Sequence, residues 1–172
     1  MPKPIVNLDE LEFDDIEDNG YYTSRRARFS AAIGARQLGY NLTELPPGKA
    51  QCPFHSHRAE EEMFLILEGE GELRFGSQRF PIRKHDVIAC PTGGADLAHQ
   101  IVNTGNSTMR YLALSNLQEV EVCVSTRTRT RLASSQIRQA PLGFEGCTAL
   151  RRRWTTTMAK SLNHRPSDAL GL

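Results

Sequence analysis

Short apolar stretches separated by turn-forming residues fill the middle of the chain, and this pattern restricts the fold more than any other feature. Leu38, Tyr40 and Leu42 alternate with small or polar residues, and residues 62–68 form a longer apolar run. Further short stretches follow around residues 73–75, 79–82, 87–90, 99–102 and 109–114, with Gly, Pro, Asn, Asp or Ser between them. This region lacks the 3.6-residue period of an amphipathic helix. We therefore expect an all-β sandwich or barrel.

The run at 62–68 is apolar on both of its faces. Phe64 and Ile66 lie on one face of the expected strand, and three further apolar residues lie on the other. A strand that is apolar on both faces must be covered on both. One face can line the barrel, whereas the other requires the N-terminal arm or a second subunit. This pattern favours a homodimer.

Charge divides the 172 residues into three zones, although the formal net charge is only +1. Residues 1–24 contain seven acids and one lysine, residues 25–124 are balanced, and residues 125–172 contain nine basic and two acidic residues. We interpret these zones as an acidic N-terminal arm, a barrel domain and an irregular basic tail. The strands of the barrel should end near Leu117.

The tail at 125–172 is open to more than one interpretation. Its composition, rich in Arg, Thr, Ser, Ala and Leu, is typical of a frameshifted GC-rich coding sequence, or of a disordered segment. Basic residues beside Trp154 could hold nucleic acid, but no stacking platform is evident, so nucleic acid is not an expected partner.

Targeting signals and disulfide patterns are absent from the sequence. The first ten residues have no basic flank and no apolar core, and no apolar run approaches the ~20 residues of a membrane helix. We expect a cytoplasmic protein that has no membrane partner. The four cysteines are widely and irregularly spaced, which predicts free thiols.

Three histidines indicate a metal site. His55 and His57 are two residues apart, so on a strand they point to the same face, about 7 Å apart. Two neutral imidazoles placed in this way can converge on one ion. His99 begins another alternating stretch and supplies the third imidazole.

A carboxylate completes the set. Glu60, Glu61 and Glu62 are adjacent, and Glu62 is favoured because it shares strand parity with Phe64. Glu61 has the opposite parity, and Glu60 falls in the preceding turn. Three imidazoles and one carboxylate suit a divalent Zn, Mn, Fe, Ni, Co or Cu ion. One or two coordination positions remain for water or substrate. Side chains expected to line a pocket beside the metal are Tyr40, Asp96 and Gln100.

The arrangement of these residues resembles the cupin superfamily. Its first motif is a glycine, His-x-His, three or four residues, Glu, six residues and Gly, which matches the segment ending at Gly69. Its second motif is matched by Pro91, Gly93, His99 and Asn103. Two departures matter: His85 stands where a glycine is usual, and five residues rather than two separate Gly93 from His99.

The resemblance implies a double-stranded β-helix, or jelly-roll barrel, that binds metal through His55, His57, Glu62 and His99. Residues 33–116 also resemble small single-domain bacterial cupins, some of which carry the label of sugar-phosphate isomerases. A metal-dependent isomerase acting on a sugar or sugar phosphate is therefore the first functional hypothesis. The alternatives are an Fe(II)-dependent dioxygenase and a non-catalytic sensor or binding module for a small ligand.

Overall fold

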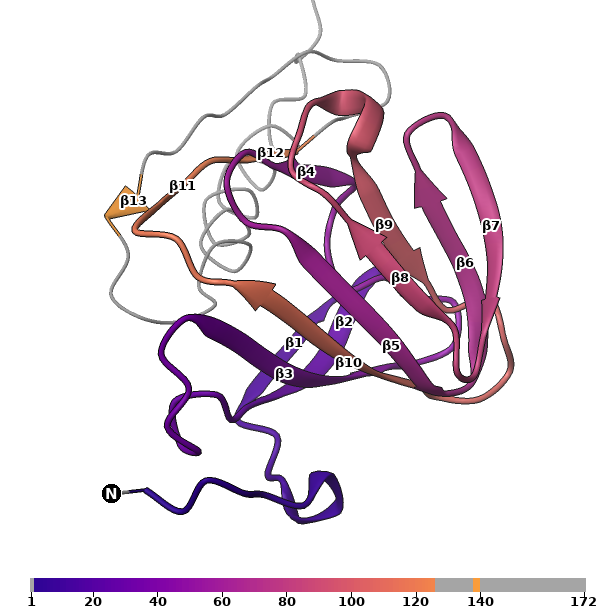
Figure 1. Cartoon of the computed structure of the whole chain (residues 1–172). Coiled ribbons are helices and arrows are strands. Elements are labelled where there is room, and N and C mark those ends of the chain that lie inside the picture. The colour runs from indigo at the N-terminus through magenta and orange to yellow at the C-terminus, as the bar shows by residue number, and fades with distance from the viewer. Residues whose placement is uncertain (1, 126–137, 140–172) are drawn as a thin grey trace, which may run out of the picture.

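The computed structural model describes residues 2–125 and 138–139, which form two antiparallel sheets that face each other (Figure 1). The six-stranded sheet contains, in spatial order, β1 (Asp15–Asn19), β2 (Tyr22–Arg28), β3 (Leu38–Leu45), β10 (Met109–Asn116), β5 (Glu62–Glu68) and β8 (Val87–Cys90). The five-stranded sheet contains β12 (Cys123–Ser125), β4 (His55–His57), β9 (His99–Val102), β6 (Glu70–Phe75) and β7 (Gln78–Arg83). A further pair joins β11 (Val120–Glu121) to β13 (Arg138–Gln139).

Helical structure in the described ranges is limited to two short 3-10 turns, η1 (Leu8–Glu10) and η2 (Ala95–Leu97). The predicted all-β jelly-roll class is confirmed. Each short apolar stretch predicted between residues 38 and 114 lies in a strand.

The main core lies between the two sheets. Alternation places Phe64 and Ile66 of β5 inside, as predicted, together with Tyr111 and Ala113 of β10. The five-stranded sheet contributes the facing side chains, which are Leu73, Ile82 and Ile101. Because inward and outward residues alternate on each strand, the register fixes which side chains can reach the barrel interior.

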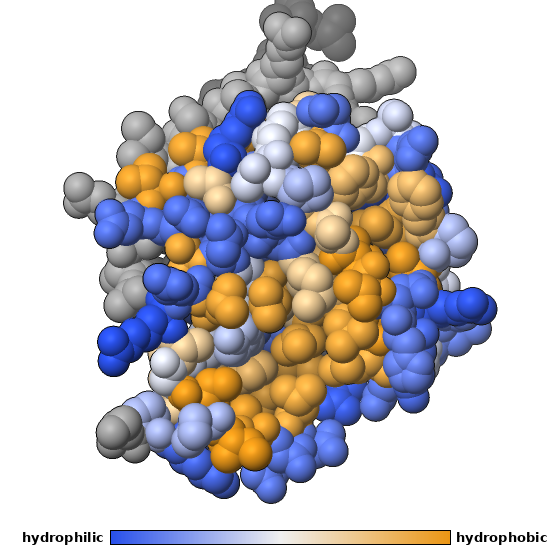
Figure 2. Space-filling view, in the orientation of Figure 1, coloured by the Kyte–Doolittle hydropathy of each residue, from blue (hydrophilic) through white to orange (hydrophobic). Residues whose placement is uncertain are grey.

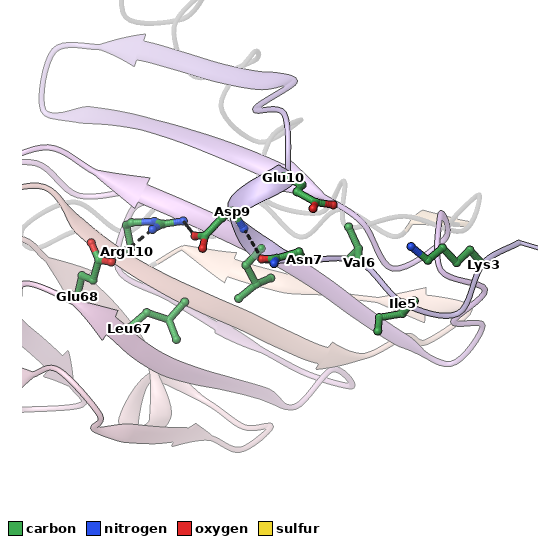
Figure 3. Close-up of a pocket in the computed structure, with 10 residues that line it drawn as sticks. Lys3, Ile5, Val6, Asn7, Asp9, Glu10, Leu67, Glu68 and Arg110 are labelled. Atoms are coloured by element: carbon green, nitrogen blue, oxygen red, sulfur yellow. Dashed lines mark hydrogen bonds and ion pairs between the residues drawn. The ribbon is translucent and has the colours of Figure 1, made fainter.

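A second apolar cluster covers part of the outer face of the six-stranded sheet. Leu67 and Leu112 pack there with buried Leu42, and residues 6–13 of the N-terminal segment lie against them. The guanidinium of Arg110 holds this segment through Asp9 at 3.6 Å and also contacts Glu68 at 3.4 Å (Figure 3). The outer face of β5 is therefore covered in part by the chain itself.

The described residues leave the rest of this outer face uncovered. Met63 and Leu65 are only half-buried, and Val87, the cross-strand partner of Leu65, is 67% exposed. Figure 2 shows a broad apolar area over the face that this sheet presents.

The acidic N-terminal zone is not only an arm. Its second half forms β1 and the beginning of β2, which extend the six-stranded sheet beyond β3. Asp15 lies 2.6 Å from Arg26 and 2.5 Å from Arg28, so acids of this zone pair with bases of the barrel. Opposite charges across neighbouring strands replace the apolar alternation that usually identifies a strand.

The expected end of the barrel near Leu117 is wrong. Residues 123–125 form β12, which pairs antiparallel with β4, so that Cys123 faces His57 and Ser125 faces His55 in the register. The physical reason is that β4 pairs with β9 on one side and its other edge needs a partner for its backbone groups.

The interpretations of the tail fall on residues outside the described ranges, apart from the two residues of β13. Within those ranges, Cys52, Cys90 and Cys123 are free thiols, as predicted. No helix in the described part of the chain is both long enough and apolar enough to span a membrane.

Candidate metal centre

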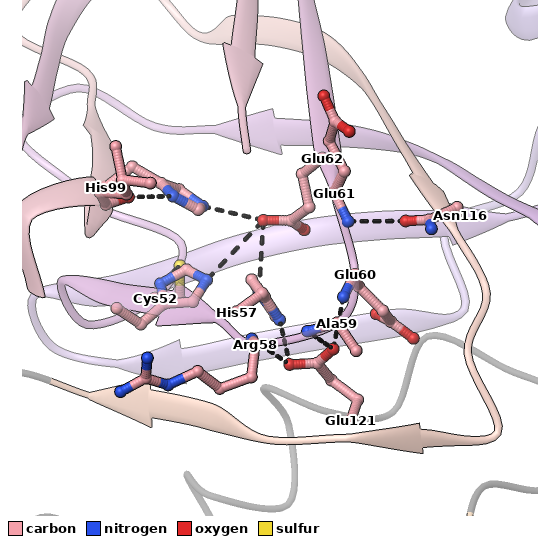
Figure 4. A network of polar contacts seen from close by, with 12 residues as sticks. Cys52, His57, Arg58, Ala59, Glu60, Glu61, Glu62, His99, Asn116 and Glu121 are labelled. Atoms are coloured by element: carbon pink, nitrogen blue, oxygen red, sulfur yellow. Dashed lines mark hydrogen bonds and ion pairs between the residues drawn. The ribbon is translucent and has the colours of Figure 1, made fainter. Parts of the chain in front are cut away.

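The four predicted ligands converge inside the barrel. One oxygen of Glu62, Oε2, lies 2.8 Å from Nε2 of His99, 3.3 Å from Nε2 of His57 and 3.9 Å from Nε2 of His55 (Figure 4). One donor atom from each residue lies within 4.8 Å of all the others. The spacing is that of groups able to surround a single cation.

The two sheets bring these residues together. His55 and His57 share a face of β4, and His99 is the cross-strand neighbour of His55 on β9. Glu62 belongs to the opposite sheet, where it points inward with Phe64. The site thus forms only when the six-stranded and five-stranded sheets pack against each other.

Burial and charge set the protonation of the cluster. All four side chains are buried. Burial alone would raise the pKa of Glu62, but the charge and hydrogen bond of His57 and the hydrogen bond of His99 outweigh it, so its pKa is lowered. Burial lowers the pKa of His99. Metal ligation requires an ionised carboxylate and neutral imidazoles, so an ion bound here would displace the proton that gives His57 its charge.

A backbone carbonyl orients the His55 ring. Nδ1 of His55 lies 2.8 Å from the carbonyl oxygen of Pro53. Because a carbonyl oxygen only accepts, Nδ1 carries the ring proton and Nε2 keeps its lone pair for the cluster.

Gln100 lies beside the site rather than in the ligand group. It occupies the opposite face of β9 from His99 and is buried. Its amide nitrogen donates to the carbonyl oxygen of Cys52 at 2.7 Å, and its oxygen accepts from Arg74 at 2.6 Å. The Arg74 guanidinium also stacks over Phe54, 4.5 Å from the ring centroid. These contacts hold the loop that leads into β4.

Tyr40 and Asp96 are also placed outside the ligand group. Tyr40 lies on the outer face of β3, where it packs against Phe29 with ring centroids 5.8 Å apart. Asp96 lies in η2, and its side chain is exposed. Their roles in binding a ligand stay predictions.

Glu121 is the contact that sequence reasoning missed. Its Oε1 lies 3.4 Å from Nδ1 of His57, on the side of the ring away from Glu62. Together with Glu60 it forms a second group of metal-capable donors around His57. Burial raises the pKa of Glu60 to about 7, and the negative charges of Glu121 and Glu62 add to this shift. The only signal in the sequence was the alternation of acids and valines at 119–122.

A buried hydroxyl belongs to the cross-strand neighbour of Glu62. Ser115 is the cross-strand neighbour of Glu62 on β10 and lies on the same inward face as Ala113. Its Oγ is buried and forms no hydrogen bond within the described residues. A buried hydroxyl in this situation is usually satisfied by a bound water or a ligand oxygen.

The sequence matches a family profile described as "Cupin domain" over residues 41–115. The oxalate-binding protein of Thermotoga maritima is 37% identical over 71 residues, which make up 41% of this chain and 55% of that protein. The chain spans about half the length of the curated relatives that it matches.

Two solved structures extend the comparison. A sugar phosphate isomerase of the cupin superfamily from Silicibacter pomeroyi has a TM-score of 0.66 at 21% identity, covering 84% of this chain and 99% of the other. A predicted oxalate decarboxylase from Thermotoga maritima has a TM-score of 0.57 at 27% identity, covering 66% of this chain and 99% of the other. The first similarity concerns the fold alone.

Proposed function

The chain belongs to the cupin superfamily, and we propose that its barrel holds one divalent transition metal ion at which a small molecule binds through oxygen atoms. The observation that carries this proposal is the convergence of four donor atoms within 4.8 Å, from residues His55, His57, Glu62 and His99. Three imidazoles and an ionised carboxylate fit Zn, Mn, Fe, Ni, Co or Cu in the divalent state.

The residues around such a site would have different roles. A bound ion of this class acts as a Lewis acid that polarises a carbonyl or hydroxyl oxygen. Glu62 supplies the negative charge that balances the ion, and the imidazoles supply directed lone pairs. Ser115 offers a hydroxyl for an oxygen of a ligand that enters beside Glu62.

A small carboxylate is the ligand class that the comparisons favour. The relative with 37% identity is an oxalate-binding protein. The cupin-domain match over residues 41–115 contains all four proposed ligands. Oxalate can present two oxygen atoms to one ion, which suits a site with four protein donors and open positions. We propose that a compact oxygen-rich anion of this kind occupies the barrel.

The other functional hypotheses stay predictions. The structure described as a sugar phosphate isomerase shares the fold at 21% identity, which does not extend to its activity. The hypothesis of an Fe(II)-dependent dioxygenase depends on the identity of the metal, because it requires iron in the site. A non-catalytic sensor or binding module requires only the metal and the ligand.

Elemental analysis of the purified protein tests the metal proposal. We expect about one transition metal per chain in the wild type and loss of that metal in His57→Ala. His85→Ala is the matched control, because it removes an exposed histidine from a turn outside the cluster. Metal-free wild type that also fails to bind added Fe, Mn, Ni or Zn contradicts the proposal.

Calorimetric titration tests the ligand class. Oxalate should bind the metal-loaded protein and show no binding to the protein stripped by a chelator. Binding that is equal with and without metal would contradict the proposed mode. If a sugar phosphate binds and oxalate does not, the result favours the isomerase hypothesis.

A homodimer is the assembly that we propose. The half-buried Met63 and Leu65 and the exposed Val87 leave an apolar area that the N-terminal segment does not cover. A second copy of the chain could bury this area. Sedimentation analysis should give twice the monomer mass for the wild type and a lower mass for Leu65→Glu. The cytoplasmic location stays a prediction.

A further inference from the structure

We infer that Glu121 is a positioning residue for the metal centre, because it holds the proton of His57 on Nδ1 and leaves Nε2 of that ring free to ligate. The inference rests on the proposed function for its consequence, which is metal affinity. The proton position itself can be measured without any metal.

The two nitrogens of the His57 ring face two different carboxylates. Nε2 lies 3.3 Å from Oε2 of Glu62, and Nδ1 lies 3.4 Å from Oε1 of Glu121. Figure 4 shows the ring between the two acids, with Glu121 on the side away from His99. The ring is buried, so the two acids and not bulk water determine which nitrogen carries the proton.

A neutral imidazole has only one N–H group, and the nitrogen that binds a metal must be the other one. For His55, the carbonyl oxygen of Pro53 retains the proton on Nδ1. His57 has a different neighbour on this side of its ring, because Oε1 of Glu121 lies 3.4 Å from Nδ1. Glu121 therefore lies on the Nδ1 side of His57 as the Pro53 carbonyl lies on that of His55, although at 3.4 Å rather than 2.8 Å.

Glu121 is itself fixed in place. Its Oε1 accepts from the backbone N–H of Arg58 at 2.9 Å. Its Oε2 accepts from the backbone N–H of Ala59 at 2.9 Å and from that of Glu60 at 2.5 Å. Three consecutive amides thus bind the carboxylate to the turn that follows His57. A fixed acceptor selects one ring tautomer more strongly than a mobile one, because no side-chain freedom is lost when the hydrogen bond forms.

A second cation bound by His57, Glu60 and Glu121 is the competing interpretation of the same group. It would require the lone pairs of both His57 nitrogens, and hence a fully deprotonated ring. In addition, both oxygens of Glu121 already accept amide hydrogens. An orienting carboxylate satisfies all of these contacts with one ordinary neutral ring.

The variant Glu121→Gln tests this inference with little change in shape. The amide oxygen can replace Oε2 and keep the hydrogen bonds from Ala59 and Glu60. The amide NH₂ group then replaces Oε1 and donates to Nδ1 of His57, which moves the ring proton to Nε2. The hydrogen bond from the backbone N–H of Arg58 to Oε1 is lost in this variant. Glu119→Gln is the matched control, since it removes the same charge from an exposed position two residues away.

Two measurements are needed. In the metal-free protein, at a pH at which the His57 ring carries a single proton, long-range ¹H–¹⁵N spectra should show the Nδ1–H form in the wild type and in Glu119→Gln. The same spectra should show the Nε2–H form in Glu121→Gln. Competition titrations with Zn²⁺ and Co²⁺ should give affinity about 10–100-fold weaker for Glu121→Gln, the range typical of lost outer partners of ligating histidines. The control should match the wild type.

The possible outcomes separate the two proposals. A wild-type His57 that is protonated on Nε2 in the metal-free protein overturns the inference, even if Glu121→Gln does not fold. Equal metal affinity for Glu121→Gln and Glu119→Gln overturns it as well. A wild type that binds no metal contradicts the proposed function, while the tautomer spectra still decide the role of Glu121.

Discussion

Nε2 of His99 lies 2.8 Å from Oε2 of Glu62, although the two residues are 37 positions apart and belong to different sheets. The contact exists because β9 and β5 present their first residues to the same space inside the barrel. A bound divalent ion would replace the shared proton between these two atoms. Metal loading and the packing of the two sheets are therefore coupled.

Replacement of Glu62 should abolish tight metal binding. Glu62→Gln removes the only anionic donor of the group, and we expect affinity to fall more than about 100-fold, beyond the loss caused by outer partners. Glu61→Gln is the control, because Glu61 is adjacent and exposed. Competition titration with Zn²⁺ provides the measurement. Equal losses in the two variants would show that the choice between neighbouring glutamates was wrong.

His85 should be replaceable by glycine with a gain in stability. Its φ is +75°, which is a left-handed conformation that costs a side-chain-bearing residue on the order of 1 kcal/mol. We expect His85→Gly to raise the free energy of unfolding by about 0.5–1 kcal/mol. Urea denaturation measures this, with His85→Ala as the control that keeps the Cβ atom. A gain of the same size in the alanine variant would contradict the backbone explanation.

Tyr111→Phe should change how stability depends on pH. The Tyr111 hydroxyl donates to Oε1 of Gln51 at 2.5 Å, and loss of this bond should cost about 0.5–1.5 kcal/mol below pH 9. Burial raises the pKa of Tyr111 well above its usual 10.0. Above pH 10 the unfolded chain therefore loses a proton that the folded chain keeps, and wild-type stability falls.

The decrease amounts to at most about 1.4 kcal/mol per pH unit for one group, and the phenylalanine variant lacks this contribution. Urea denaturation of both proteins at pH 7, 9 and 10.5 should show the difference in stability narrowing at the highest pH. A constant difference across this range would mean that Tyr111 ionises similarly in the folded and unfolded chains.

Gln100→Ala should loosen the loop before β4. The substitution leaves the Cys52 carbonyl oxygen and a guanidinium hydrogen of Arg74 without their present partner, which costs about 1–3 kcal/mol. Cys52 should then react faster with a thiol reagent, as followed by mass spectrometry. Gln78→Ala, at an exposed strand position, should change neither quantity. An unchanged Cys52 reaction rate would remove Gln100 from this role.

The sequence predicted the elements whose apolar residues alternate. Parity along 62–68 was enough to select Glu62 and to place it with Phe64 inside the barrel. By contrast, β1 and β2 could not be predicted from the sequence, because they are stabilised by charge pairs such as Asp15 with Arg26 rather than by an apolar stripe. Local patterns carry no information about which distant strand neutralises a charge.

Other parts of the site depend on contacts that spacing does not encode. Glu121 reaches His57 across 64 positions, through a turn whose amides it accepts. Tyr40 was expected in a pocket, but it lies on the outer face because Asn41 and Thr43 of the same strand take the inward positions. The inward or outward direction of a strand residue needs at least one known neighbour.

The pairing of β12 with β4 has a genetic consequence. Backbone pairing tolerates most side chains, so the codons for Val124 and Ser125 can vary while the histidine strand keeps its neighbour. Cys123 is constrained further, because its side chain is buried. A stop codon after Ser125 would keep β12 and Glu121 but remove β13, the partner of the strand that carries Glu121. A stop codon after Leu117 would remove both β12 and Glu121. A frameshift before residue 121 would therefore remove both Glu121 and the strand beside His55 and His57, whereas one after residue 125 leaves both in the sequence.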